Sequence, residues 1–256
     1  MKKNRRAFLK TACVAACAVG AGIFGIGRLT SMMNQVEALK NIIAEKLIKR
    51  HGKREGQALM AAIVQEFQTA CASLPYLGSK EENRWVDNMP PTALALATYR
   101  ALVPQEANLQ QVGQILFESV QIELSGLPSL FMRMMYNEKT TMERLRTLAV
   151  RSQRRQYAQD WVMTFAESSG EDFTYGLNVT ECAIQKYLTK QKAPELTRYL
   201  CLTDYLSSKA MNRGLVRFKT LAEGCAVCDF RFKEGRPSYL HPLRDGWPPK
   251  FVDSQA

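Results

Sequence analysis

Histidine is nearly absent from this 256-residue chain, which contains only His51 and His241. The first lies near the end of an expected helix and the second in a proline-rich tail, so neither is placed to act as a general base. Internal repeats and low-complexity segments are also absent, so the chain is not a repeat protein. Its composition, 46% hydrophobic and 23% charged, is that of a folded globular chain and argues against disorder.

Acidic residues are missing from residues 1–30, which carry six positive charges and leave only +5 of the net +11 for the rest. A mildly basic body does not require nucleic acid as a partner. Arginines do recur between positions 144 and 155, but no aromatic-rich strands accompany them. They are therefore interpreted as the solvated face of a helix, and no nucleic-acid partner is expected.

The N-terminus begins with Asn4-Arg5-Arg6-Ala7-Phe8-Leu9-Lys10 and continues with a weakly apolar run of 17 residues to Gly27. Adjacent arginines followed by x-Phe-Leu-Lys are similar to a twin-arginine export signal, with Asn4 where Ser or Thr is usual. The run is short for a membrane-spanning helix at about 1.5 Å per residue. We expect recognition by the twin-arginine translocation machinery, followed by a periplasmic location or anchoring to the outer face of the cytoplasmic membrane. No good Ala-x-Ala cleavage site follows the run, so removal and retention of the signal both stay open.

A paired set of cysteines is also lacking, because five remain once Cys13 and Cys17 of the leader are set aside. An odd number at uneven spacing does not indicate a disulfide framework. Four of the five fall in the C-terminal third, where they form the most informative feature of the composition. These four are Cys182, Cys201, Cys225 and Cys228.

The hydrophobic periodicity predicts an α+β fold with a helical N-terminal half, followed by a small antiparallel sheet with covering helices. The helices are expected at 31–53, 56–72, 92–102, 108–124, 141–167, 181–190 and 194–207. Strands are expected at 172–179, 215–221 and 226–233, the last two forming a hairpin. After the signal at 1–30, we expect a single domain over 31–256. Within it, the helical part covers 31–170, the sheet-containing part 171–236 and an irregular tail 237–256.

The C-terminal third also places acidic residues beside its thiols. Cys182 lies where a strand passes into a helix, and the positive end of a helix dipole favours a thiolate there. Cys201 and Asp204 are three residues apart on an expected helix and therefore share a face. Cys228 alternates with Asp229 on an expected strand, so these two side chains point to opposite faces.

These same residues carry a resemblance to a known family. The stretch Asn178-Val-Thr-Glu-Cys182, the pair Cys201-x-x-Asp204, the stretch Leu221-Ala-Glu-Gly224 and the run Cys228-Asp-Phe-Arg-Phe232 follow in order. They resemble the L-2-amino-thiazoline-4-carboxylic acid hydrolase family over about residues 172–233. The resemblance implies hydrolytic opening of a small cyclic amidine-thioether at a C–S or C–N bond, with a carbamoyl-cysteine product. Cys182, Cys201, Asp204, Cys228 and Asp229 match positions of the family motifs, whereas Cys225 does not.

Two mechanisms are open for such a site. In one, Cys182, Cys201, Asp204 and Cys228 bind a divalent metal such as zinc, which activates a water molecule. In the other, a thiolate, for which Cys182 is the first candidate, attacks the substrate while Asp204 or Asp229 transfers protons.

Other interpretations of the same residues also stay open. Arg217 or Arg231 is a candidate for binding a substrate carboxylate, although an exposed strand face explains both arginines equally well. Each cysteine alone is explained equally well as a small buried hydrophobe. A non-catalytic ligand-binding or sensory module in the cell envelope is the main alternative to a hydrolase. A membrane-tethered structural protein is a further one.

Overall fold

The structure is a computed structural model that describes residues 29–105, 107–126, 136–168, 170, 172–239 and 243. Residues 1–28 of the expected export signal, His241 and most of the expected tail lie outside these residues. The chain divides into two compact units, Met1–Glu123 and Leu124–Ala256, each described separately below. Within the described ranges, every helix is too short or too polar to cross a membrane. The single domain expected over 31–256 stays a prediction.

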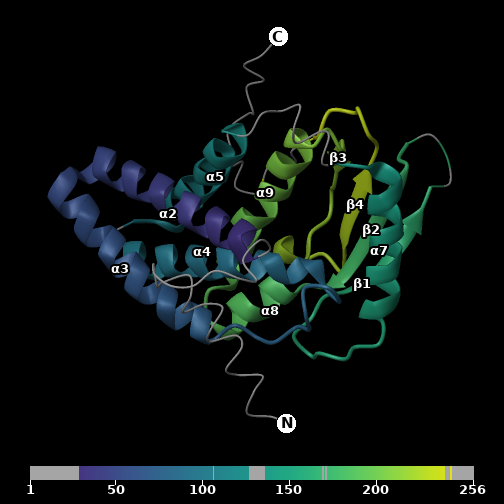
Figure 1. Cartoon of the computed structure of the whole chain (residues 1–256), viewed down its shortest axis with the longest axis horizontal. Helices are drawn as coiled ribbons and strands as arrows, with labels where there is room; N and C mark the ends of the chain where they lie inside the picture. Colours follow the sequence, from purple (N-terminus) through teal and green to yellow (C-terminus); the bar gives the residue numbers. More distant parts are fainter. Residues whose placement is uncertain are drawn as a thin grey trace. The chain divides into compact units, whose positions relative to one another are not determined.

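The first unit is helical, as the periodicity predicts (Figure 1). Its helices are α2 (Leu29–His51), α3 (Lys53–Ala72), α4 (Met89–Leu102) and α5 (Leu109–Ser125), with short 3-10 turns η1 (Arg84–Asn88) and η2 (Val103–Gln105). All four α-helices were expected within a few residues of their observed bounds. Helices α3 and α4 each begin three residues early, and α4 begins before the expected Thr92 because two prolines occupy its first turn, where a missing N–H is tolerated.

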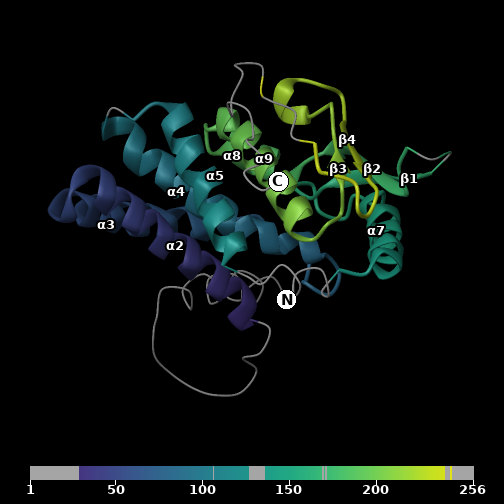
Figure 2. The same cartoon turned by 90° about the horizontal axis from the view of Figure 1, so that it is seen from above.

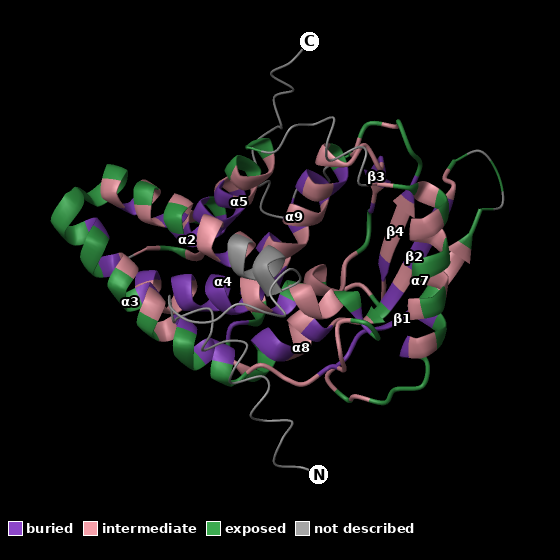
Figure 3. Cartoon of the chain, viewed as in Figure 1, coloured by how far each residue is buried: buried purple, intermediate pink, exposed green. Residues whose placement is uncertain are grey.

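A tight connection joins α2 to α3 and sets how closely these helices approach. Gly52 has a φ of 82°, a conformation that glycine adopts without steric cost. A Cβ on Gly56 would lie 2.6 Å from the backbone of Ile48, so only glycine allows this contact. Ile63 and Phe67 of α3 are fully buried. Figure 3 shows that α4 is buried along much of its length, with nine of its 14 residues buried.

The second unit contains all of the described strands and the helices that cover them. Its elements are α7 (Glu138–Ser152), β1 (Val162–Glu167), β2 (Tyr175–Glu181), α8 (Ala183–Lys190), η3 (Pro194–Leu196), α9 (Thr197–Ala210), β3 (Leu215–Val216), η4 (Leu221–Glu223) and β4 (Cys228–Phe232). The four strands form one antiparallel sheet in the order β1-β2-β4-β3. The predicted α+β class is therefore confirmed.

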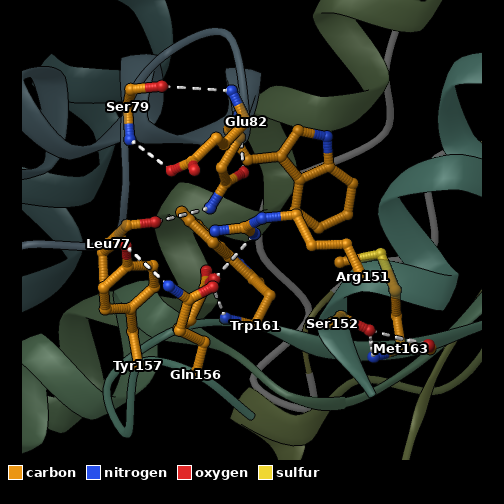
Figure 4. Close-up of polar contacts among 12 residues, drawn as sticks. Leu77, Ser79, Glu82, Arg151, Ser152, Gln156, Tyr157, Trp161 and Met163 are labelled. Atoms are coloured by element: carbon orange, nitrogen blue, oxygen red, sulfur yellow. Dashed lines mark hydrogen bonds and ion pairs between the residues drawn. The ribbon is translucent and has the colours of Figure 1, made fainter. Parts of the chain in front are cut away.

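The prediction of one long helix over residues 141–167 is wrong. Helix α7 ends at Ser152, Arg155 adopts a left-handed φ of 50°, and residues 162–167 form strand β1. The Ser152 hydroxyl group accepts a hydrogen bond from the Met163 N–H and donates one to the Met163 carbonyl, each at 3.0 Å (Figure 4). No glycine or proline marks this helix end, and burial of Val162 and Met163 in the sheet outweighs the helical pattern of the preceding residues.

The sheet has one apolar face and one polar face. Tyr175 of β2 stacks on Phe232 of β4 with ring centroids 4.9 Å apart, and Tyr205 of α9 belongs to the same buried cluster. Helix α7 runs beside β1 on this sheet (Figures 1 and 2). On the opposite face, Arg231 donates to the Asn178 side chain at 2.8 Å. Residues on the apolar face of β4 are therefore the ones directed toward the covering helices.

The expected hairpin is only partly as predicted. Leu215 pairs with Phe232 and Val216 with Arg231, as an antiparallel hairpin requires. The first strand, however, ends at Val216 and does not continue to Leu221, because residues 221–223 form a 3-10 turn. The longer connection, residues 217–227, supplies side chains to the site described next.

Candidate functional site

Cys182 occupies the junction between β2 and α8. It is the residue that caps the N-terminus of α8, and its carbonyl oxygen accepts the first helical hydrogen bond from Lys186 at 2.9 Å. Nearby in β2, Thr180 donates its hydroxyl to the Val162 carbonyl at 3.2 Å. Burial raises the pKa of the Cys182 thiol. Hydrogen bonds from the backbone N–H groups of Gln185 and Ile184 and from the Trp161 indole lower this pKa, but burial has the larger effect.

Cys201 and Asp204 lie one turn apart on α9, as predicted, and both are bonded to Arg217. The Arg217 Nη1 atom donates to the Asp204 Oδ2 atom, and its Nη2 atom donates to the Cys201 carbonyl, each at 2.7 Å. The Arg217 carbonyl in turn accepts from the Tyr205 hydroxyl at 2.8 Å. One arginine therefore fixes the connection after β3 against a single face of α9.

The Arg217 side chain is only 1% exposed, whereas that of Asp204 is 45% exposed. Its guanidinium carbon lies 5.1 Å from the Tyr205 ring centroid and 4.6 Å from that of Phe230, so both rings contribute cation–π attraction. Burial opposes the charge, but Asp204 and Cys201 hold the pKa of Arg217 above its ordinary value. The interpretation of Arg217 as a residue on an exposed strand face is therefore wrong.

Cys228 is the first residue of β4 and pairs with Val179 of β2. Its side chain shares the apolar face with Phe230 and Phe232, as the alternation predicted, and its sulfur accepts from the Leu221 N–H at 3.2 Å. Burial raises the pKa of the Cys228 thiol to about 11. This thiol is therefore protonated at neutral pH.

The three thiols and one carboxylate meet in one neighbourhood. Burial raises the pKa of the Cys201 thiol well above its ordinary value, and Asp204, Cys182 and Cys228 raise it further, whereas Arg217 lowers it. Such mutual effects require the groups to lie close together. The folded chain therefore brings Cys182, Cys201, Asp204 and Cys228 into one neighbourhood, in which Arg217 acts on Cys201, Asp204 and Cys228. We call Cys182, Cys201 and Cys228 the thiol cluster.

Asp229 and Arg231 do not join this neighbourhood, because they alternate with Cys228 and Phe230 along β4. The Asp229 Oδ1 atom accepts from the N–H groups of Phe218 and Lys219 at 3.0 and 2.6 Å. The Arg231 guanidinium lies over the Phe173 ring at 5.2 Å, on the polar face with Asn178. Asp229 thus holds the connection after β3, and Arg231 braces the sheet.

The predicted metal ligands are engaged in other interactions. Among the residues that the structure describes, no group of three or more His, Cys, Asp and Glu side chains is arranged to hold a metal ion. The Asp204 Oδ2 atom accepts from the Arg217 guanidinium, which already supplies positive charge beside it. The metal stays a prediction.

A pocket opens beside the thiol cluster, with about 340 Å³ of empty space that is partly open to solvent. Cys201 and Arg217 line it together with Leu202, Tyr205 and Phe218. Leu202, Tyr205 and Phe218 were not predicted from the sequence. Tyr205 follows Leu202 by three residues and Cys201 by four. This is the spacing of residues on one helix face, so it could have predicted this face of α9.

Residues at this site define a thiol–carboxylate–arginine centre on an α+β unit. The sequence model of the L-2-amino-thiazoline-4-carboxylic acid hydrolase family matches residues 128–232. The match ends at Phe232, the last residue of β4, and covers every member of the thiol cluster as well as Asp204 and Arg217. No curated protein and no solved structure matches this chain.

Proposed function

We propose that the second unit is a hydrolase that opens L-2-amino-thiazoline-4-carboxylate or a closely related small cyclic amidine. The observation that carries the proposal is the coincidence of two independent features. The family match spans residues 128–232, and the three thiols that meet with Asp204 and Arg217 all lie inside that span. A family match alone suggests a fold and a class of chemistry. Whether that chemistry applies to this chain depends on the residues of its site.

The reaction requires a nucleophile at the ring carbon between nitrogen and sulfur. Addition of water to this carbon and cleavage of the ring C–S bond leave both nitrogens on the carbon and release a thiol, which gives a carbamoyl-cysteine. The chain offers thiols as nucleophiles and Asp204, 45% exposed, as the carboxylate for proton transfer. Asp229 is a weaker candidate for this role because its Oδ1 atom already accepts two backbone N–H groups.

A metal-dependent variant of this proposal uses the same residues. Zinc held by Cys182, Cys201 and Cys228 would supply a Lewis acid and an activated water molecule, provided that Asp204 left the fourth position to water or the coordination expanded. Metal analysis of the purified protein separates the variants, because a zinc enzyme contains about one equivalent and loses activity on chelation. A protein that turns over fully after chelation, without bound zinc, uses its thiols as nucleophiles.

The test is turnover of the thiazoline carboxylate by the purified chain. New thiol groups are followed with a thiol reagent after removal of the protein, and the carbamoyl product by chromatography. We expect both signals to rise together, and the double variant Cys182→Ser/Cys228→Ser to reduce them by about 100-fold or more. Cys71→Ser, which changes a buried cysteine of the first unit, is the matched control. Absence of product with the wild-type chain would refute the hydrolase.

One observation favours a second candidate, a non-catalytic ligand-binding or sensory module. Burial raises the pKa of all three cluster thiols, which favours their protonated, less nucleophilic form in the free protein. A binding module predicts stoichiometric retention of the intact thiazoline by the wild-type chain, with no new thiol groups. The same chromatography therefore separates the two functions.

We further propose that the protein acts at the cell envelope after export by the twin-arginine machinery. Arg5, Arg6 and Lys10 support this location through their similarity to that signal. Export of an already folded chain would allow the thiols to be buried before the protein leaves the reducing cytoplasm.

A further inference from the structure

The pocket beside α9 has a mixed lining that suits a small zwitterionic ring. Leu202, Tyr205 and Phe218 supply apolar and aromatic surface, and Arg217 and Glu223 supply charge of both signs. A cyclic amidine that carries a carboxylate is itself a zwitterion near neutral pH, so a lining of both signs is complementary to it.

Phe218 gives this pocket an aromatic wall. Its side chain is 62% exposed, although a large apolar ring in the connection after β3 would usually be buried. The Phe218 and Tyr239 rings lie 6.2 Å apart and tilted by 43°, and Tyr239 is 53% exposed as well. An exposed aromatic pair at a pocket is typical of a surface on which a planar ligand stacks.

Arg217 lines the pocket and carries one unsatisfied donor. Its Nη1 and Nη2 atoms are bonded to Asp204 and the Cys201 carbonyl, but its Nε atom has no hydrogen-bond partner among the described residues. A donor left unsatisfied in a side chain that is 1% exposed is costly.

Of the three cluster thiols, Cys201 is the one whose residue lines this pocket. Resting on the proposed hydrolase function, we infer that the pocket binds the ring of a cyclic amidine and that Cys201, in place of Cys182, is the nucleophile. The assignment follows from the pocket's position, because a nucleophile must reach the reacting carbon of the bound substrate.

The inferred reaction needs no histidine, because the substrate carries its own base. The reacting form is the neutral amidine, which is in equilibrium with the zwitterion: the Cys201 thiol proton passes to its ring nitrogen as sulfur bonds to the amidine carbon. The ring C–S bond then breaks, and the departing sulfur takes a proton from a nitrogen of the adduct and becomes the free thiol of the product. Water adds to the same carbon, the bond to Cys201 breaks, and the thiol is restored as the carbamoyl product leaves. No oxidant or reductant takes part.

The experiment uses 2-chloroacetamidine, a small amidine that alkylates a thiol with loss of chloride, on the full chain. Peptide mapping by mass spectrometry then locates the label. We expect Cys201 to be labelled at least about tenfold faster than Cys182 or Cys228, and Phe218→Ala to slow this labelling. Preferential labelling of Cys182 or Cys228, or no labelling of Cys201, overturns the inference.

Turnover of the thiazoline carboxylate provides the second arm. Cys201→Ala should lose at least about 1,000-fold in kcat, whereas Cys225→Ala, which changes a cysteine outside the cluster, should not. Turnover by Cys201→Ala within about tenfold of wild type refutes this inference while the hydrolase stands. Labelling of Cys201 in a chain that never opens the ring supports the pocket assignment and refutes the hydrolase, so the two failures are distinguishable.

Discussion

Arg217 and Asp204 form an ion pair whose two members differ in their contact with water. The guanidinium is 1% exposed, and its other hydrogen bond is to the Cys201 carbonyl. The carboxylate is 45% exposed and can be hydrated without its partner. The pair therefore stabilises the fold unequally, because only the arginine depends on its partner for compensation of its charge.

This inequality gives a prediction at the scale of single residues. Asp204→Ala leaves a buried cation without its carboxylate and should lower the free energy of unfolding by about 3–5 kcal/mol. Arg217→Met leaves a carboxylate that water can reach and should cost clearly less. Urea unfolding of both variants measures the difference.

The double variant Asp204→Ala/Arg217→Met serves as the control. Removal of the buried cation should make the double variant at least as stable as Asp204→Ala alone, since the uncompensated charge has gone. An Arg217→Met variant that is less stable than Asp204→Ala would contradict this account of the pair.

The sequence identified most members of the site but not their arrangement. The spacing of Cys201 and Asp204 predicted a shared helical face, and the alternation after Cys228 predicted which side chains turn inward. The burial of Arg217 was not predicted, although alternation from the buried Leu215 places its side chain on the same face. Its charge is compensated there by Asp204 and the Cys201 carbonyl, contacts that hydrophobic periodicity does not reveal.

At the scale of elements, Lys46 of α2 and Glu118 of α5 join two helices of the first unit by an ion pair. Burial alone would raise the pKa of Glu118, but its hydrogen bonds to Lys46 and Gln114 outweigh this effect and leave the pKa below its ordinary value. A carboxyl group with a lowered pKa stabilises the fold above the pKa of the unfolded chain. That stabilisation is lost as the pH falls through the folded pKa.

We therefore expect Glu118→Gln to be less stable than wild type at pH 6 and about equally stable at pH 3. Because the Glu118 side chain is 38% exposed, the difference should stay below about 1 kcal/mol. Thermal unfolding across this pH range measures it. Glu45→Gln, at an exposed position of α2, is the matched control and should show no comparable trend. A Glu118 effect that grows toward acid pH would refute the sign derived above.

Elements with clear end signals were predicted well, whereas those without them were not. Gly52 and the prolines at positions 90 and 91 mark helix boundaries that were expected within a few residues. Between Ser152 and Val162 the chain has neither glycine nor proline, so the periodicity was extended across a real boundary. The antiparallel pairing of β1 with the next strand, β2, holds residues 162–167 in the sheet, and periodicity alone did not reveal this pairing.

At the scale of the whole molecule, export should depend on the two adjacent arginines. Replacement of Arg5 and Arg6 by lysine preserves the charge of the leader but removes the twin-arginine pair, so exported protein should fall by about tenfold or more. Fractionation of cells that express each variant measures this loss. Lys2→Arg/Lys3→Arg, an exchange at neighbouring positions, should be exported normally. Equal export of both variants would point to a different route.

Asp229, on the polar face of the sheet, accepts hydrogen bonds from the Phe218 and Lys219 N–H groups and so holds the connection after β3. A residue on the side away from the thiols determines the path of the backbone that carries the aromatic wall. Inherited changes at position 229 could therefore alter which molecules are admitted without touching any group that meets them. In a lineage that diversifies its chemistry, changes at such a remote support would reshape this wall while the thiol cluster stays where it is.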